Sequence, residues 1–168
     1  MKQIIYNFDF EKEKLSPLIA SLKKNNNKIV FTNGCFDILH VGHLRYLQKA
    51  KALGDILIVG LNSDSSVKKI KGINRPIIQE KQRAELLSAL KPVDYVIIFS
   101  SPTPLDLIKE ISPDCLTKGG DWSVETIVGG EHVLATGGKV TSITFEKGFS
   151  STNIIDIILK KELADDRK

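Results

Sequence analysis

Residues 28–43 read KIVFTNGCFDILHVGH, and this stretch decides the fold. Its first part, residues 28–32, is a short apolar run of the kind that forms a buried strand. A turn at 33–37 follows, and residues 44–53 then have the apolar spacing of an amphipathic helix. A buried strand that leads directly into a helix predicts the first unit of a parallel sheet covered by helices.

Two histidines stand where this predicted helix begins. His40 and His43 are three residues apart, so they share one face of the helix. The unpaired backbone N–H groups and the positive end of the helix dipole lie at the same place. Gly42 between them allows an oxyanion to approach the backbone. The segment H-x-G-H therefore predicts a polyphosphate site beyond the end of the first strand.

Strands and helices alternate along the rest of the chain. Further apolar strands are expected at 55–60, 95–99, 114–117 and 139–144. Helices are expected at 11–24, in a short segment capped by 62–64, at 79–90, at 103–111 and from Ser151 onward. This alternation predicts α/β architecture: one domain over residues 1–168 with a doubly wound, Rossmann-like parallel sheet of about five strands.

Charge and cysteine content narrow the functional classes. The chain has 24 Lys and Arg against 20 Asp and Glu, a net charge of +4, which suits anionic small molecules and does not indicate nucleic acid. Cys35 and Cys115 are far apart in the sequence and predict reduced thiols. No signal-peptide pattern and no apolar run of membrane length is present. We therefore expect a cytoplasmic protein without a membrane partner.

Two motifs resemble the signature of the cytidylyltransferase-like nucleotidyltransferases. They are GCFDILHVGH at 34–43 and FSSTNII at 149–155. Between them, NSD at 62–64, NRP at 74–76, QR at 82–83 and KGGDW at 118–122 fall in the order expected of this superfamily. The resemblance covers about residues 28–160 and implies the HxGH nucleotidyltransferase fold.

Within the superfamily, the chain most resembles the adenylyltransferases that form ADP-heptose from D-glycero-β-D-manno-heptose 1-phosphate for lipopolysaccharide. Residues 31–40, 114–121 and 145–152 carry this likeness. In many bacteria that activity is fused behind a sugar-kinase domain, and we expect a stand-alone form here. Ser151 stands where threonine is usual and keeps the hydroxyl. Phe145 stands where glycerol-phosphate cytidylyltransferases have arginine, which argues against that sister activity.

The resemblance implies attack by a sugar 1-phosphate on the α-phosphorus of ATP, with pyrophosphate leaving. His40, His43, Lys69 and Lys71 are the expected catalytic residues. Mg²⁺ is expected to bind mainly through substrate phosphates, with no dedicated protein ligands. The nucleotide is expected to contact Thr32, Asn33, Gly34, Cys35, Phe36, Gly42, Asn62, Lys118, Gly119, Asp121, Ser150, Ser151 and Thr152. The acceptor is expected to contact Asp37, Arg83 and Trp122. A homodimer is expected from the family tendency and from the exposed edges of an open sheet.

Several alternatives remain open at this point. The nearest is glycerol-3-phosphate cytidylyltransferase or another phosphate-ester nucleotidyltransferase. One of a different class is a nucleotide-binding module without catalysis. Several residues have plainer interpretations: Lys69 and Lys71 as a solvated face, Arg83 as a helix-surface ion pair, Asp37 as a brace of its loop, Trp122 as packing, Lys118 as part of a strand-end turn, and Ser151 and Thr152 as a helix cap.

Overall fold

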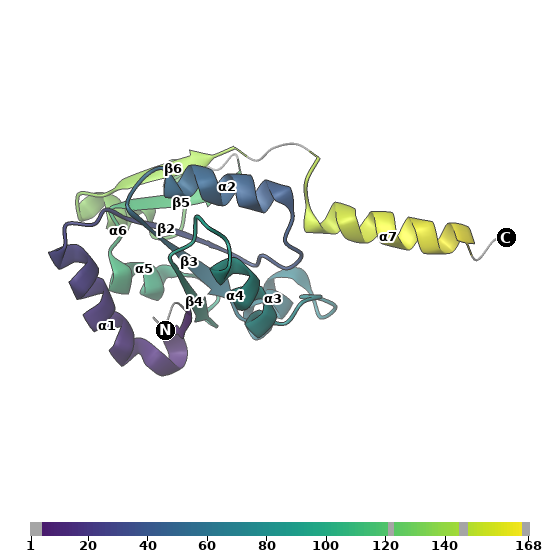
Figure 1. Ribbon diagram of the computed structural model, residues 1–168, viewed down its shortest axis with the longest axis horizontal. Helices are drawn as coiled ribbons and strands as arrows, with labels where there is room; N and C mark the ends of the chain where they lie inside the picture. The colour runs from purple at the N-terminus through teal and green to yellow at the C-terminus, as the bar shows by residue number, and fades with distance from the viewer. Residues whose placement is uncertain (1–4, 121–122, 145–147, 166–168) are drawn as a thin grey trace.

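The computed structural model describes residues 5–120, 123–144 and 148–165, and its centre is a sheet of parallel strands in the order β1-β4-β3-β2-β5-β6 (Figure 1). All of its strand pairs are parallel. The strands are β1 (Ile5–Asn7), β2 (Ile29–Gly34), β3 (Ile56–Asn62), β4 (Tyr95–Phe99), β5 (Cys115–Gly119) and β6 (Lys139–Ile143).

The helices lie between the strands, as the alternation predicts. They are α1 (Phe8–Lys24), α2 (Val41–Lys51), α3 (Asp64–Lys71), α4 (Glu80–Ser88), α5 (Leu105–Ile111), the 3-10 turn η1 (Val124–Thr126), α6 (Gly130–Ala135) and α7 (Ser151–Asp165). The α/β class is confirmed, and so are the five predicted strands. The prediction missed β1 and α6. They are three and six residues long, which is too short to show a recognisable hydrophobic period.

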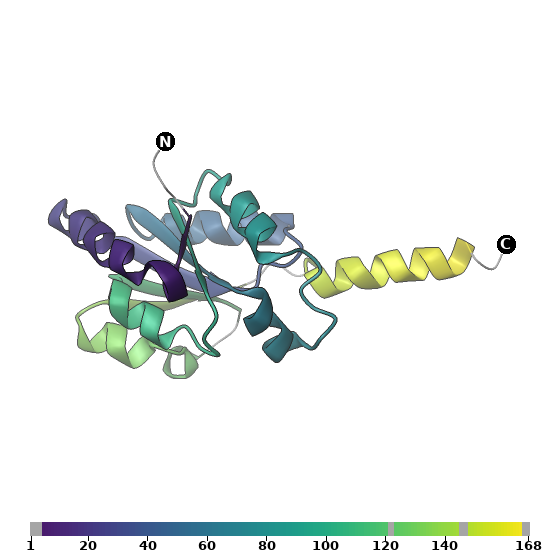
Figure 2. The same ribbon diagram turned by 90° about the horizontal axis from the view of Figure 1, so that it is seen from below.

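Alternating side chains give the sheet two apolar faces. Helices α1, α5 and α6 cover one face of the sheet, and α2 and α4 cover the other (Figure 2). Ile29 and Phe31 of β2 pack in the core on the first face, and Val30 packs in the core on the second. All three side chains have no exposed surface. This double burial explains why the strands are continuous apolar runs.

The strand order places a topological switch point between β2 and β5. From β2 the chain continues through β3 to β4 on one side, and then crosses to β5 and β6 on the other side. In open parallel sheets, ligands bind in the crevice beyond the carboxyl ends of the strands at such a point. The H-x-G-H segment directly follows β2 and therefore lies at this crevice.

The last helix, α7, projects away from the sheet (Figure 1). Its side chains Ile157, Ile158 and Leu159 are about half exposed, between 47% and 52%. Within the described residues, no helix has the combined length and hydropathy needed to cross a membrane.

Candidate active site

A cleft of about 490 Å³ opens at the carboxyl ends of β2, β3 and β5. The last two residues of β2 and the turn that follows line its floor, over residues 33–37. His43 and Tyr46 of α2, Lys71 of α3 and Lys118 of β5 add to its walls. Residues predicted at the end of the first strand, at the start of the helix that follows it and at the end of the strand at 114–117 therefore meet in one place.

The two histidines form a stacked pair at the start of α2. His40 is the N-cap residue, with an extended backbone at φ −143° and ψ 169°, and its carbonyl accepts a hydrogen bond from the His43 N–H at 2.9 Å. The ring centroids lie 3.8 Å apart with an interplanar angle of 21°. Spacing along one turn of the helix thus places both imidazoles over the N-terminal N–H groups.

Hydrogen bonding and burial indicate that both rings are neutral. Nδ1 of His40 accepts from the His43 N–H at 3.4 Å, which leaves the ring proton of a neutral His40 on Nε2. Burial lowers the pKa of His43 to about 4, with further contributions from His40 and Lys71, and burial also lowers the pKa of His40. A neutral imidazole still donates one hydrogen bond, so the pair offers donors and carries no fixed charge.

His43 has a polar atom without a protein partner. Its Nδ1 is buried and has no hydrogen-bond partner among the described residues. The ring is held between His40 and the ring of Phe36, whose centroid lies 5.2 Å away. Phe36 has φ 45°, an unusual backbone conformation for a bulky residue and one that occurs preferentially at functional sites. Such features are expected of a side chain whose polar partner is a ligand.

Gly42 lies against two side chains of the site. A Cβ atom at this position would lie 2.9 Å from Cβ of Phe149 and 3.0 Å from Nδ1 of His40. The absent side chain therefore makes room for these two side chains, and the approach of an oxyanion to the backbone at Gly42 stays a prediction. Ring packing, with centroids of His40 and Phe149 6.5 Å apart, ties the start of α2 to the segment before α7.

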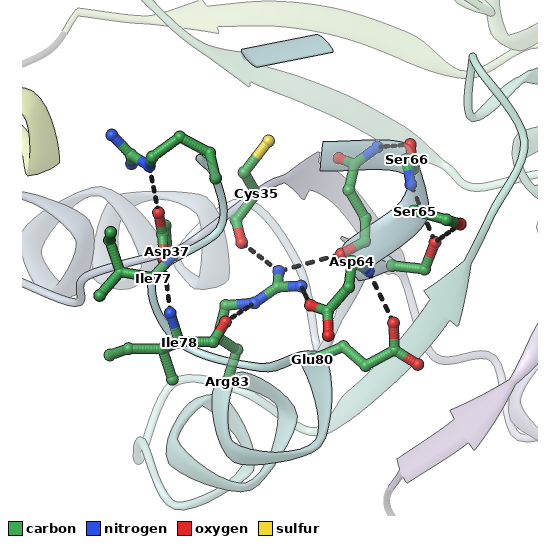
Figure 3. Close-up of polar contacts among 12 residues, drawn as sticks. Cys35, Asp37, Asp64, Ser65, Ser66, Ile77, Ile78, Glu80 and Arg83 are labelled. Carbon is green, nitrogen blue, oxygen red and sulfur yellow. Dashed lines mark hydrogen bonds and ion pairs between the residues drawn. The ribbon is translucent and has the colours of Figure 1, made fainter. Parts of the chain in front are cut away.

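Arg83 forms a buried clamp beneath the turn that follows β2, which we call the site loop (Figure 3). Its side chain is 0% exposed, and all three guanidinium nitrogens donate hydrogen bonds. The acceptors are the carbonyls of Cys35, Asn62 and Ile78 and the carboxylate of Asp64, the latter at 2.7 Å. These contacts contradict the prediction that Arg83 orients the acceptor phosphate. The guanidinium group is already engaged by protein acceptors, and Arg83 does not line the cleft.

Asp37 braces the same loop from the other side. Its carboxylate accepts hydrogen bonds from Arg75 Nε and from the backbone N–H groups of Ile77 at 2.8 Å and Ile78 at 2.9 Å (Figure 3). The residue is 2% exposed. Of the two interpretations that the sequence left open for Asp37, these contacts are those of the structural brace.

A buried hydroxyl pair lies under the floor of the cleft. Thr32 is 0% exposed, and its Oγ1 lies 2.6 Å from the Tyr46 hydroxyl. Thr32 therefore supports the site from below and does not line it, unlike its prediction as a nucleotide contact. Tyr46 lines the cleft and was not predicted, although its position three residues after His43 on the same helix is the signal that marks it. Asn62 lines the cleft as predicted, and its amide donates to Ser66 Oγ at 2.9 Å.

Of the two predicted catalytic lysines, only Lys71 lines the cleft. Both belong to the last turn of α3 and not to a loop. Lys71 lines the cleft beside Ile70, whereas Lys69 does not. The segment after β4, with Pro102, Thr103 and Pro104, also lines the cleft and had no recognisable motif.

The second motif reaches the site through one residue. Ser151 lines the cleft, is 8% exposed, and donates a hydrogen bond to the Ile38 carbonyl at 3.1 Å. Ser150 caps α7 by accepting from the Asn153 N–H at 3.0 Å, and Thr152 is exposed. Ser151 therefore fits the interpretation of this motif as part of the binding site, and Ser150 fits its interpretation as a helix cap. The predicted contacts Asp121 and Trp122, and the discriminating Phe145, lie outside the described residues.

Comparisons with known proteins agree with this geometry. A family model described as cytidylyltransferase-like matches residues 31–157. The bifunctional protein HldE of Geobacter metallireducens is 54% identical over 146 residues, covering 87% of this chain and 30% of that protein. The bifunctional protein HldE of Campylobacter jejuni is 53% identical over 156 residues, covering 92% of this chain and 33% of that protein. The chain thus spans about a third of the length of these curated relatives.

Two solved structures share the architecture. A lipopolysaccharide core biosynthesis protein from Thermoplasma volcanium is 32% identical, with a TM-score of 0.59, covering 73% of this chain and 99% of that one. The pantoate-beta-alanine ligase of Francisella tularensis is 18% identical, with a TM-score of 0.59, covering 91% of this chain and 76% of that one. The second likeness concerns the fold alone.

Removing the Arg83 clamp is expected to destabilise the protein strongly. Arg83→Met leaves three backbone carbonyls and the Asp64 carboxylate without their donor. We expect the free energy of unfolding to fall by about 3–5 kcal/mol, measured by urea denaturation. Lys81→Met, at an exposed position of the same helix, is the control and should cost less than about 0.5 kcal/mol. Equal stability of the two variants would contradict the clamp.

The buried His43 is expected to make stability depend on pH. Between pH 6.5 and about 4 the unfolded chain binds a proton at this ring and the folded chain does not, so the free energy of unfolding falls as the pH falls. His43→Asn should remove on the order of 2–3 kcal/mol of this change, measured by urea denaturation at pH 7 and pH 4.5. His132→Asn, far from the cleft, should retain the wild-type dependence. An unchanged dependence in His43→Asn would show that its ring does not resist protonation.

Proposed function

Since this chain belongs to the cytidylyltransferase-like family and is a nucleotidyltransferase, we propose that it transfers AMP from ATP to D-glycero-β-D-manno-heptose 1-phosphate, giving ADP-heptose and pyrophosphate. The observation that carries the proposal is the stacked His40–His43 pair at the start of α2, of which His43 lines the cleft. The relative from T. volcanium, described as a lipopolysaccharide core biosynthesis protein, supports a product destined for a surface glycan.

The proposed reaction is a single displacement at phosphorus. An oxygen of the acceptor phosphate forms a bond to the α-phosphorus of ATP, and the bond from that phosphorus to the bridging oxygen breaks. The electron pair leaves with pyrophosphate. Such a transfer needs alignment and charge stabilisation more than covalent help from the protein.

The pair of histidines suits this requirement. Each neutral ring donates one hydrogen bond to phosphate oxygens whose negative charge grows as pyrophosphate departs. The start of α2 adds its N–H groups and the positive end of its dipole. Lys71, at the end of α3, lines the cleft and adds a positive charge near His43.

The proposal includes Mg²⁺ bound through phosphate oxygens. Within the described part of the chain, no group of three or more His, Cys, Asp or Glu side chains is placed to hold a metal ion. An ion that arrives with the nucleotide would be held mainly by phosphate oxygens, and it would neutralise phosphate charge. Asp37 lines the cleft but is engaged by Arg75 and two backbone N–H groups.

We further propose a homodimer that works in the cytoplasm, where ATP and sugar phosphates are available. The exposed side chains Ile157, Ile158 and Leu159 of α7 support a partner surface, because large apolar side chains gathered on one projecting helix are costly to leave in water.

A pyrophosphate-release assay tests the proposed reaction. The protein with ATP, Mg²⁺ and the β-anomeric heptose 1-phosphate should release pyrophosphate and form ADP-heptose, detected by anion-exchange chromatography. Replacing ATP by CTP, and the sugar phosphate by glycerol 3-phosphate, should abolish most turnover. Preference for CTP and glycerol 3-phosphate would instead identify the cytidylyltransferase activity. Nucleotide binding by calorimetry without turnover on any acceptor would identify a binding module.

Loss of either histidine is expected to impair the chemical step. His40→Ala and His43→Ala should each lower kcat by about a hundredfold or more, because each removes a donor to the developing charge. His132→Ala should retain wild-type kcat. Near-normal turnover in both site variants would overturn the assigned role.

A further inference from the structure

Lys118 stands at the junction of two cavities. It lies near the end of β5, next to Asn33 of β2, so it occupies the switch point of the sheet. It lines the main cleft and also an adjoining pocket of about 180 Å³. Asn33, Pro104, Lys118, Thr126, Ile127 and Val128 line that pocket. The pocket is too small for a nucleotide, since pockets for ligands of that size exceed about 300 Å³.

The ammonium group of Lys118 is only partly satisfied. Its Nζ donates to Asn33 Oδ1 at 3.2 Å and to the Asn33 carbonyl at 3.5 Å. Both acceptors are neutral, and the ion pairs of the described residues do not include Lys118. An ammonium has three N–H donors, so at least one remains for a ligand.

This environment favours an anionic ligand. Burial lowers the pKa of Lys118, because the charged form loses hydration that two neutral acceptors replace only in part. Lys118 is half-buried and has no charged partner among the described residues. An anion that entered the cleft would restore the missing stabilisation.

The two arginines near the cleft do not line it. Arg83 holds backbone carbonyls and Asp64. Arg75 pairs with Asp37 through Nε, and its buried Nη2 has no partner among the described residues. Lys71 acts on the His43 side, where the nucleotide phosphates are proposed to lie. The acceptor phosphate, which must approach the α-phosphorus from another direction, still requires a positive group.

We infer that Lys118, positioned by Asn33, binds the phosphate of the acceptor, and that the adjoining pocket takes part of the acceptor's polyol body. This inference rests on the proposed nucleotidyl transfer. It assigns Lys118 to the acceptor, whereas the sequence alone predicts a nucleotide contact. Thr126 and Asn33 provide polar groups in the pocket, and Ile127 and Val128 provide apolar ones.

Steady-state kinetics of Lys118→Met test the inference with ATP and heptose 1-phosphate as varied substrates. Methionine keeps the length of the side chain and removes the charge, so the fold should persist. We expect KM for heptose 1-phosphate to rise about 10- to 100-fold and KM for ATP to change less than about twofold. Lys118→Arg should recover part of the acceptor affinity, and Lys109→Met, exposed on α5, should match the wild type.

Opposite results have clear meanings. A rise in KM for ATP, alone or equal to that for the acceptor, would assign Lys118 to the nucleotide and overturn the inference. Unchanged values for both substrates would also overturn it. If the wild type forms no product, the proposed function fails separately. Calorimetry with heptose 1-phosphate and with ATP then decides the question. Only weaker binding of heptose 1-phosphate to Lys118→Met, with ATP binding unchanged, supports the inference. If Lys118→Met does not fold, Lys118→Gln takes its place.

Discussion

A single guanidinium group holds together the elements that frame the cleft. Arg83, on α4, donates to the carbonyl of Cys35 after β2 and to the carbonyl of Asn62 at the end of β3. It also pairs with Asp64 in the first turn of α3. A buried arginine is stable only when its donors are satisfied, and carbonyls at strand ends require donors in return. Each side thus requires the other, and the turn after β2, which lines the cleft, is held in place as a consequence.

The placement of this loop matters because the histidine pair depends on it. Phe36, in a strained backbone conformation, packs against His43, which stacks on His40. Enclosure of the rings by these neighbours removes hydration and keeps them neutral near pH 7. Donors that are fixed in advance stabilise developing charge better than groups that must reorganise during the reaction. The hydrogen bonds of Arg83 therefore stabilise the loop in which Phe36 is strained and against which the histidine rings are desolvated.

The order of the strands separates two kinds of positive group. On the α2 side are backbone N–H groups, neutral rings and the exposed Lys71. On the β5 side is Lys118, partly buried and bonded to Asn33. A reaction between two anions needs both to be neutralised while they are held close together, because their repulsion opposes the approach. A crevice between two diverging halves of a sheet provides a separate support for each.

The main outline of the fold could be predicted from the sequence. Buried parallel strands are continuous apolar runs, and five of them were recognised within a few residues. β1 was missed because its three residues form a strand only through pairing with β4, a partner about 90 positions away. The class of site was also predictable, because the histidine spacing and the strand–turn–helix setting are local properties.

The sequence by itself determined that residues 33–37, His43 and Lys118 lie near one cleft, since the ends of parallel strands meet at one edge of the sheet. Only the tertiary structure decided what those residues contact. Arg83 and Cys35 are 48 positions apart, Asp37 and Ile77 are 40 apart, and Lys118 and Asn33 are 85 apart. Such pairings depend on strand order and register, which no local pattern encodes. The same guanidinium or carboxylate can bind substrate or brace a loop, and its burial and its partners separate the two roles.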